Sequence, residues 1–276
     1  MIILKLAFST NAFRNYSIEQ SISIIAKTGY DAIELMCDVP HAFPPISEEQ
    51  VISIQNSLKK NKIDISNLNG FMMCAIGDFH HPSWIEHVPL RRQKRITHTI
   101  NCIDLAKKLG VKTVSTEPGG PLESITEKKG FEIFKECLDQ VIPIAEKNKI
   151  KLLIEPEPNL LIENSTQFLN FISNFNTKYL GLNFDIGHFF CVREEPVTLL
   201  KSLKDYISHI HLEDIASNRV HEHLIPGKGA INFQEIFEAL NSINYTGFVT
   251  VELYPYQKNP EQAAREAMEF LKNMVC

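Results

Sequence analysis

Two kinds of hydrophobic pattern alternate along the chain. Short runs rich in β-branched residues, which are typical of buried strands, are separated by longer segments in which apolar residues recur every three or four positions, as in amphipathic helices. The segment 17–28 shows the helical pattern clearly, with Ser17 suited to its N-cap and Gly29 to its end. The sequence Ser-Glu-Glu-Gln at 47–50 fits a capping box at the start of the next helix.

The pattern predicts eight strands, each followed by a helix. The strands are expected at 4–9, 31–36, 63–68, 111–116, 150–155, 179–184, 207–212 and 247–253. The helices are expected at 17–28, 47–61, 90–109, 127–148, 165–174, 196–203, 232–241 and 260–274, with a break or kink at Pro143. A regular alternation of this kind predicts a parallel sheet covered by helices, and eight units predict a closed (β/α)8 barrel, the TIM barrel.

An open, doubly wound sheet is the structural alternative to the barrel. It would normally carry a glycine-rich phosphate turn after the first strand, whereas that turn here reads Ser-Thr-Asn-Ala-Phe. The 276 residues suit one barrel, which typically needs about 250, and no linker or low-complexity tract divides them. We therefore expect a single domain over residues 1–276. The longest non-periodic stretch, 69–89, follows the third strand, where a barrel would carry an active-site lid.

Composition and charge exclude several classes of protein. The formal net charge is −5, from 28 Lys+Arg and 33 Asp+Glu, which argues against a dedicated duplex-DNA binder because such proteins usually present a basic surface. The apolar start of the chain is too short for a membrane span and lacks the features of a signal peptide. The 6 cysteines are scattered without a CxxC motif, which indicates reduced thiols in a cytoplasmic protein.

Ligand-type side chains end four consecutive strands, the fifth to the eighth. Each follows an apolar run, and in order they are Glu155, Asp185, His211 and Glu252. The C-terminal strand ends of a barrel carry its chemistry, so these side chains should lie together at the barrel mouth. Three carboxylates and one imidazole would repel there unless a divalent cation neutralised them, and such mixed ligands suit Mn, Mg, Co, Fe or Zn.

Five motifs in the C-terminal half resemble the xylose isomerase-like barrel superfamily of sugar isomerases and epimerases. They are LLIEPEP (152–158), NFDIGH (183–188), HIHLEDI (209–215), HEHLIPGKG (221–229) and TVELY (250–254). The superfamily includes ketose 3-epimerases, hydroxypyruvate isomerases, inosose dehydratases and the endonuclease IV type of DNA repair enzyme. The resemblance implies that Glu155, Asp185, His211 and Glu252 bind one divalent metal.

The same resemblance assigns roles in catalysis. It implies that Glu155 and Glu252 are also the acid/base pair and that His188 contacts the substrate, with Arg219 as the candidate for a family arginine after the seventh strand. The chemistry fits the residues independently, because moving a carbonyl or inverting the carbon beside it needs a proton transfer through a metal-stabilised enediolate. We therefore expect a metal-dependent sugar or sugar-phosphate isomerase or epimerase. We expect its substrate to be a small-molecule sugar. Since relatives are often oligomeric, further copies of the chain are the other expected partner. Neither nucleic acid nor a membrane is expected as a partner.

Three rival functions remain open. A dehydratase or lyase acting on a sugar or cyclitol would use the same metal and base but expel a hydroxyl group. An endonuclease IV-like nuclease would need further metals, for which His188, His221, His223 and Glu117 are candidate ligands. Its first metal, however, would require histidines after the third and fourth strands, where this chain offers Asn69 and Glu117. A barrel that binds a ligand without catalysis is the third rival.

Three further residues have a predicted place. Trp84, in the lid-like stretch, is a candidate hydrophobic wall over the sugar, and Glu157 is placed to reach substrate hydroxyls. His209 is expected to point away from the side chains at the mouth and into the barrel wall.

Overall fold

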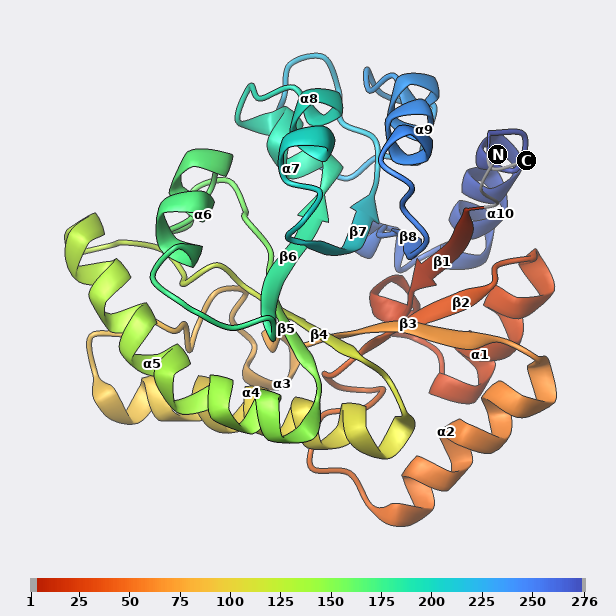
Figure 1. Ribbon diagram of the computed structural model, residues 1–276. Helices are drawn as coiled ribbons and strands as arrows, with labels where there is room; N and C mark the ends of the chain where they lie inside the picture. The colour runs from red at the N-terminus through yellow and green to blue at the C-terminus, as the bar shows by residue number, and fades with distance from the viewer. Residues whose placement is uncertain (1–3, 275–276) are drawn as a thin grey trace.

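The eight expected strands form a closed barrel in the computed structural model, which describes residues 4–274 (Figure 1). All neighbouring strands within those residues pair in parallel and in chain order, and β1 pairs with β8 to close the sheet. The strands are β1 (Lys5–Ser9), β2 (Ala32–Met36), β3 (Asp64–Asn69), β4 (Thr113–Thr116), β5 (Lys151–Ile154), β6 (Leu180–Asp185), β7 (Ile207–Leu212) and β8 (Phe248–Val251). The predicted (β/α)8 barrel is confirmed.

Helices surround the barrel on its outside, as Figure 1 shows. They are α1 (Ile18–Thr28), α2 (Glu48–Asn61), α4 (Pro89–Leu109), α5 (Glu127–Asn148), α6 (Ser165–Ile172), α8 (Pro196–Ser202), α9 (Phe233–Ser242) and α10 (Pro260–Leu271). Four short helices that the pattern does not predict follow strand ends: η1 (Thr10–Phe13), α3 (Met73–Ile76), α7 (Ile186–Cys191) and η2 (Tyr254–Tyr256). These short elements shape the mouth of the barrel.

Local sequence explains where several helices begin and end. Ser47 closes the predicted capping box of α2. Ser17 is the N-cap of α1 as predicted and also closes a capping box, and Gly29 ends α1 in the left-handed conformation with φ of 104°. Of the break or kink expected at Pro143, the break does not occur, since α5 runs without interruption from Glu127 to Asn148. A proline removes only one bond from the helical ladder, and the buried apolar face of α5 holds the helix against the barrel.

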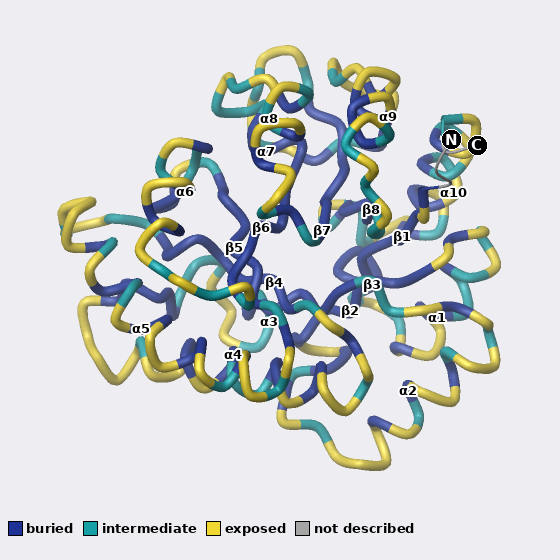
Figure 2. The backbone as a smooth tube through the Cα atoms, viewed as in Figure 1, coloured by how far each residue is buried: buried dark blue, intermediate teal, exposed yellow. Residues whose placement is uncertain are grey.

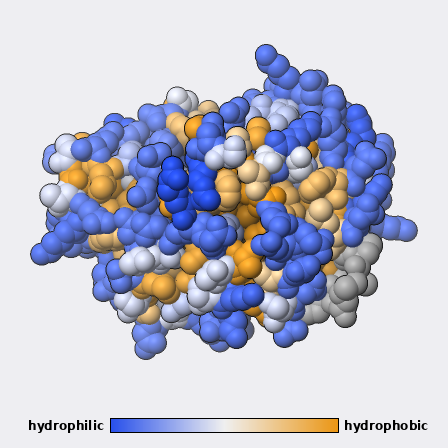
Figure 3. Space-filling model, turned by 90° about the horizontal axis from the view of Figure 1, so that it is seen from above, coloured by the Kyte–Doolittle hydropathy of each residue, from blue (hydrophilic) through white to orange (hydrophobic). Residues whose placement is uncertain are grey.

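Burial follows the layers of the fold. Figure 2 shows the strands as almost continuously buried, whereas the helices alternate between buried inner and exposed outer positions. The surface in Figure 3 is mostly hydrophilic, with apolar patches between polar areas. None of the helices within residues 4–274 combines the length and apolar character that a membrane span requires.

The segment between β3 and α4 lies over the barrel mouth, as the sequence predicts for a lid. It contains α3, and its side chains Phe71, Met73 and Phe79 line the cavity at the mouth. Asp38, which follows β2, anchors this lid because its carboxylate accepts the backbone N–H groups of Cys74 (2.5 Å) and Ala75 (2.8 Å).

Candidate metal centre

The four residues predicted as metal ligands converge at the C-terminal end of the barrel. Glu155 and Glu252 directly follow β5 and β8, Asp185 is the last residue of β6, and His211 lies near the end of β7. Each is buried and offers one ligand atom within 4.8 Å of those of the other three. His211 Nδ1 lies 2.7 Å from Glu155 Oε1, 3.5 Å from Glu252 Oε2 and 3.8 Å from Asp185 Oδ2.

The electrostatics of this group favour a bound cation. Burial raises the pKa of Glu155 and, more strongly, that of Glu252, and neighbouring carboxylates add to both shifts while His211 opposes them. Glu155 Oε2 and Asp185 Oδ2 are buried without a hydrogen-bond partner. Unpaired buried oxygens are costly, and a divalent cation would satisfy both of them. The residues present therefore fit a divalent metal.

Glu34, on β2, is a central residue of the site that the strand-end argument missed. Its side chain is fully buried, and its Oε1 lies 2.7 Å from His211 Nε2 and 3.3 Å from His209 Nε2. Burial opposes ionisation, yet the two histidines together hold the pKa of Glu34 well below its usual value. His211 Nε2–H thus donates to a carboxylate, which directs Nδ1 to the ligand group. A single charged residue within the otherwise apolar β2 was the signal in the sequence.

His209 does not point away from the mouth side chains as predicted. It faces Glu34 inside the barrel, and its ring centroid lies 5.4 Å from that of His211. The physical reason is the twofold period of a strand, which places residues two positions apart on the same face of the sheet.

A cavity opens above the ligand group. Its polar lining includes the amides of Asn11 and Asn69, which both donate to Glu252 Oε1, at 2.9 and 3.2 Å. Asn69 is therefore a positioning group for Glu252. The apolar lining of the cavity is formed by Met36, Phe71, Met73, Phe79 and the ring of Tyr254. Glu157 also lines the cavity, with Oε2 buried and unpartnered, and burial among other carboxylates raises its pKa well above the usual value.

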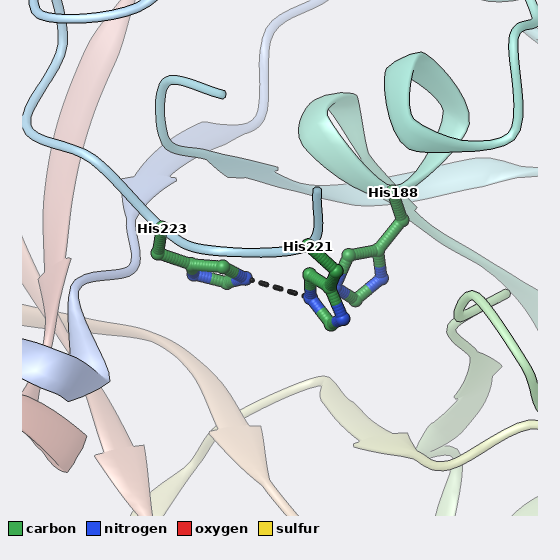
Figure 4. Close-up of side chains that lie close together, drawn as sticks. All are labelled: His188, His221 and His223. Carbon is green, nitrogen blue, oxygen red and sulfur yellow. Dashed lines mark hydrogen bonds between the residues drawn. The ribbon is translucent and has the colours of Figure 1, made fainter. Parts of the chain in front are cut away.

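Three histidines, His188, His221 and His223, meet at the cavity (Figure 4). His188 Nδ1–H donates to the carbonyl oxygen of Pro156 at 2.9 Å, and His223 Nδ1–H donates to that of Glu252, also at 2.9 Å. His221 Nε2 lies 3.1 Å from His223 Nε2. Burial lowers the pKa of each histidine to about 3, so all three are neutral and present ring nitrogens that can bind a metal or a hydroxyl group.

Glu117 does not join the three histidines. Its carboxylate lies 3.4 Å from Arg95 Nη2 beneath the lid, where both side chains are buried. Burial raises the pKa of Glu117 to about 7, although Arg95 opposes the shift. Among residues 4–274, Glu117 belongs to none of the groups whose geometry could hold a metal ion.

Trp84 and Arg219 also lie away from the cavity. Trp84 is fully buried below the lid, where its Nε1–H donates to Thr116 Oγ1 at 3.0 Å and its ring packs on Phe134. Arg219 stacks on Phe190, with its guanidinium carbon 4.0 Å from the ring centroid, and donates to the Phe190 carbonyl oxygen at 2.7 Å. The tryptophan is thus a core anchor of the lid, and the arginine fastens its own loop to the end of α7.

Comparison with known proteins adds to this geometry. A family model described as "Xylose isomerase-like TIM barrel" matches residues 22–274. An inosose dehydratase of Mesomycoplasma hyopneumoniae is 25% identical over 291 aligned positions, which cover 94% of this chain and 89% of the relative.

Two solved structures share the fold along nearly the whole chain. A D-tagatose 3-epimerase-like protein superimposes with a TM-score of 0.78 at 22% identity, covering 99% of this chain and 100% of that one. The IolI protein, crystallised with a zinc atom, superimposes with a TM-score of 0.81 at 21% identity, covering 99% of this chain and 98% of that one.

Proposed function

The chain belongs to the xylose isomerase-like TIM barrel family, and we propose that it is a divalent-metal-dependent isomerase or epimerase of a sugar or cyclitol. The observation that carries the proposal is the buried convergence of Glu155, Asp185, His211 and Glu252 from four consecutive strands. The inosose dehydratase and the epimerase-like structure support it, because both names denote chemistry on polyhydroxylated carbonyl compounds.

These four residues would hold the metal. When bound, a divalent cation supplies a Lewis acid that polarises a substrate carbonyl and offsets the negative charge formed when the neighbouring carbon loses its proton. The zinc atom of IolI supports a metal of this class, and the mixed oxygen and nitrogen donors of this chain suit Mn, Mg, Co, Fe or Zn.

Glu155 and Glu252 supply the acid and the base in this proposal. They approach the cavity from β5 and β8, on opposite sides of β6 and β7, so they can flank a planar intermediate. Burial raises the pKa of both carboxyl groups, which favours their acceptance of a proton from carbon. Asn11 and Asn69 fix the orientation of Glu252.

His188 and Glu157 bind substrate hydroxyl groups in the same proposal. Since Nδ1–H of His188 donates to Pro156, its Nε2 is left as an acceptor next to the cavity. The unpartnered Oε2 of Glu157 lines the same cavity. Both groups can accept hydrogen bonds from the hydroxyl groups of a polyol bound in this cavity.

A dehydratase is the second candidate, favoured by the inosose dehydratase relative. It shares the first proton abstraction and then expels a β-hydroxyl group, so the products distinguish the two. Ketoses, hydroxypyruvate and inososes should be incubated with protein loaded with each metal in D₂O and followed by NMR. Deuterium entry next to the carbonyl together with an epimer or isomer supports the first function, and an unsaturated or deoxy product the second.

Glu252→Gln tests the roles of the residues. We expect it to lower turnover by at least about 100-fold, because a general base contributes about 10²–10⁴-fold. Glu136→Gln, an exposed change on α5, is the matched control. Full turnover by Glu252→Gln with metal bound would rule out the proposed acid/base pair.

A second metal held by His188, His221 and His223, whose ring nitrogens lie within 4.8 Å of one another, is the alternative to binding of a substrate hydroxyl by His188. Elemental analysis should find one ion in the wild type, and a second ion that His221→Asn loses would support this alternative. One ion in both proteins excludes the second site. Three zinc ions together with cleavage of abasic DNA would instead favour the nuclease.

A further inference from the structure

We propose that this site takes an uncharged substrate, a free keto sugar or keto cyclitol, and discriminates against sugar phosphates and keto acids. The inference rests on the proposed function and narrows its substrate class. It derives from the charges that line the cavity. It also derives from the nearby arginines and backbone N–H groups, which already have partners within the protein.

The cavity lining is rich in carboxylates and, among the described residues, contains neither lysine nor arginine. Asp38, Glu155, Glu157 and Glu252 all face it. A divalent cation would offset only two of the three ligand carboxylates, Glu155, Asp185 and Glu252, and so would leave the centre negative without counting Glu157. A phosphate or carboxylate group would therefore enter a field of its own sign.

The arginines around the mouth are engaged elsewhere. Arg95 lies against Glu117 below the lid, and Arg219 stacks on Phe190. Arg14 is the remaining candidate, and its Nη1 lies 2.9 Å from Cys74 Sγ and 3.9 Å from Met73 Sδ. Its guanidinium thus contacts the lid but is not part of the cavity lining. None of the three forms the fork by which arginine typically binds phosphate.

Two backbone donors at the first turn of α3 are already occupied. The N–H groups of Cys74 and Ala75 both donate to Asp38, whose second role is to line the cavity. A phosphate ester that extends from the metal centre to the lid would meet this carboxylate and the rings of Phe71 and Phe79. Phosphate sites in proteins instead present converging N–H groups or cationic side chains.

The groups that remain available suit hydroxyls. Asn11 Oδ1 and Glu157 Oε2 are buried without partners, and both residues line the cavity. Hydroxyl groups can donate to these oxygens and to His188 Nε2, while the aromatic rings cover the C–H faces of a sugar. A neutral polyol therefore matches the wall at each position where a phosphate does not.

Matched pairs of ligands test the inference. Binding of xylitol, sorbitol and myo-inositol to the metal-loaded protein should be compared by calorimetry with that of their monophosphates, with inorganic phosphate as a separate arm. We expect each neutral compound to bind at least about 100-fold more tightly than its phosphate, since like charges brought together across an interface cost several kcal/mol. Equal or tighter binding of the phosphates overturns the inference, as does the failure of every neutral compound to bind.

Two variants locate the source of the discrimination. Measured at a pH high enough to ionise Glu157, whose pKa is raised, Glu157→Gln should narrow the difference in affinity between each neutral compound and its phosphate at least about threefold, because one negative charge is removed from the wall. The control Glu136→Gln should leave this difference in affinity unchanged. A preference for phosphate that Arg14→Gln abolishes would show that the lid arginine turns inward, which contradicts the proposal.

The binding experiment and the deuterium-exchange assay distinguish failure of the proposed substrate class from failure of the proposed function. Selective binding of neutral polyols without any deuterium exchange in ketoses or inososes would contradict the proposed chemistry and leave the substrate class standing. Exchange in a ketose phosphate faster than in the free ketose would support the chemistry and overturn the substrate class.

Discussion

At the scale of single residues, His211 is the most constrained side chain of the centre. Glu34 and Glu155 hold its two ring nitrogens, each at 2.7 Å. Burial alone would lower the pKa of His211, but Glu155, Glu34 and Glu252 together raise it well above the usual value. A metal must therefore displace a proton from Nδ1, while the bond from Nε2 to Glu34 keeps the ring in place.

Replacing Glu34 by Gln should weaken metal binding without removing any ligand. The amide keeps the shape of the side chain but loses the charge that makes His211 a more basic donor. Loss of such a supporting contact typically costs about 10–100-fold in metal affinity. Competition with a chelating dye measures the change, and Glu136→Gln is the control. An unchanged affinity would show that Glu34 does not tune the centre.

Glu117 should make the stability of the protein depend on pH. Its pKa is about 7 in the folded state against 4.5 for the unperturbed group, so the folded state binds more protons between these values and stability falls as pH rises through them. In Glu117→Gln this contribution disappears. The free energy of unfolding of the variant relative to the wild type should therefore rise by about 2–3 kcal/mol between pH 4.5 and pH 8.

Urea unfolding at several pH values measures this difference. The attraction of Arg95 acts on the ionised carboxylate only and is already part of the folded-state pKa of Glu117, so it adds no separate pH dependence. Parallel pH profiles of variant and wild type would contradict the assigned shift.

At the scale of elements, one carboxylate organises the loop between β7 and α9. Asp214 accepts the backbone N–H groups of Gly227 and Gly229 at Oδ2, and those of Ile215 and Ile231 at Oδ1. The same loop carries His221 and His223 to the cavity. The position of both histidines thus depends on a side chain that does not itself touch the cavity lining.

Asp214→Asn should loosen this loop. The amide nitrogen cannot accept, so about two of the four bonds are lost and backbone donors are left unpaired, at about 1–3 kcal/mol each. Hydrogen exchange should increase at 225–231 while β1 to β6 stay protected. Asp139→Asn, an exposed change on α5, is the control, and equal protection of the loop in both variants would contradict the proposed role.

The sequence predicted the long, periodic elements well and the irregular ones poorly. The barrel order and the capping box at Ser47 follow from local pattern, and the four ligands follow from the rule that parallel strands end at one level. Trp84 and Arg219 lie in non-periodic segments, where no repeat indicates the direction of a side chain. Arg219 also adopts a left-handed backbone conformation with φ of 62°, which the sequence does not predict.

At the scale of the whole molecule, the proposed metal links the site to global stability. Its four ligands join β5, β6, β7 and β8, so a bound ion cross-links half of the barrel. Unfolded chain does not hold these ligands together, and an ion that binds only the folded state stabilises it.

Metal loading should therefore raise the melting temperature. At a free metal concentration of about 100 times Kd, the stabilisation is about 2.7 kcal/mol, which for a chain of this size corresponds to roughly 5 °C. Calorimetry with metal, and again after addition of a chelator, measures the shift and its reversal. Glu252→Gln should show a much smaller shift, and an equal shift in both proteins would place the metal elsewhere.

Closure of the barrel between β8 and β1 also sets a time at which the centre can appear during synthesis. Glu252 follows β8, the last strand. The side-chain amide of Asn11, which donates a hydrogen bond to it, lies just after β1, the first strand. A ribosome therefore exposes Asn11 some 240 residues before its partner. A nascent chain that stops before Glu252 has neither the fourth proposed ligand nor the closed sheet, so the proposed metal centre can form only after translation has passed β8.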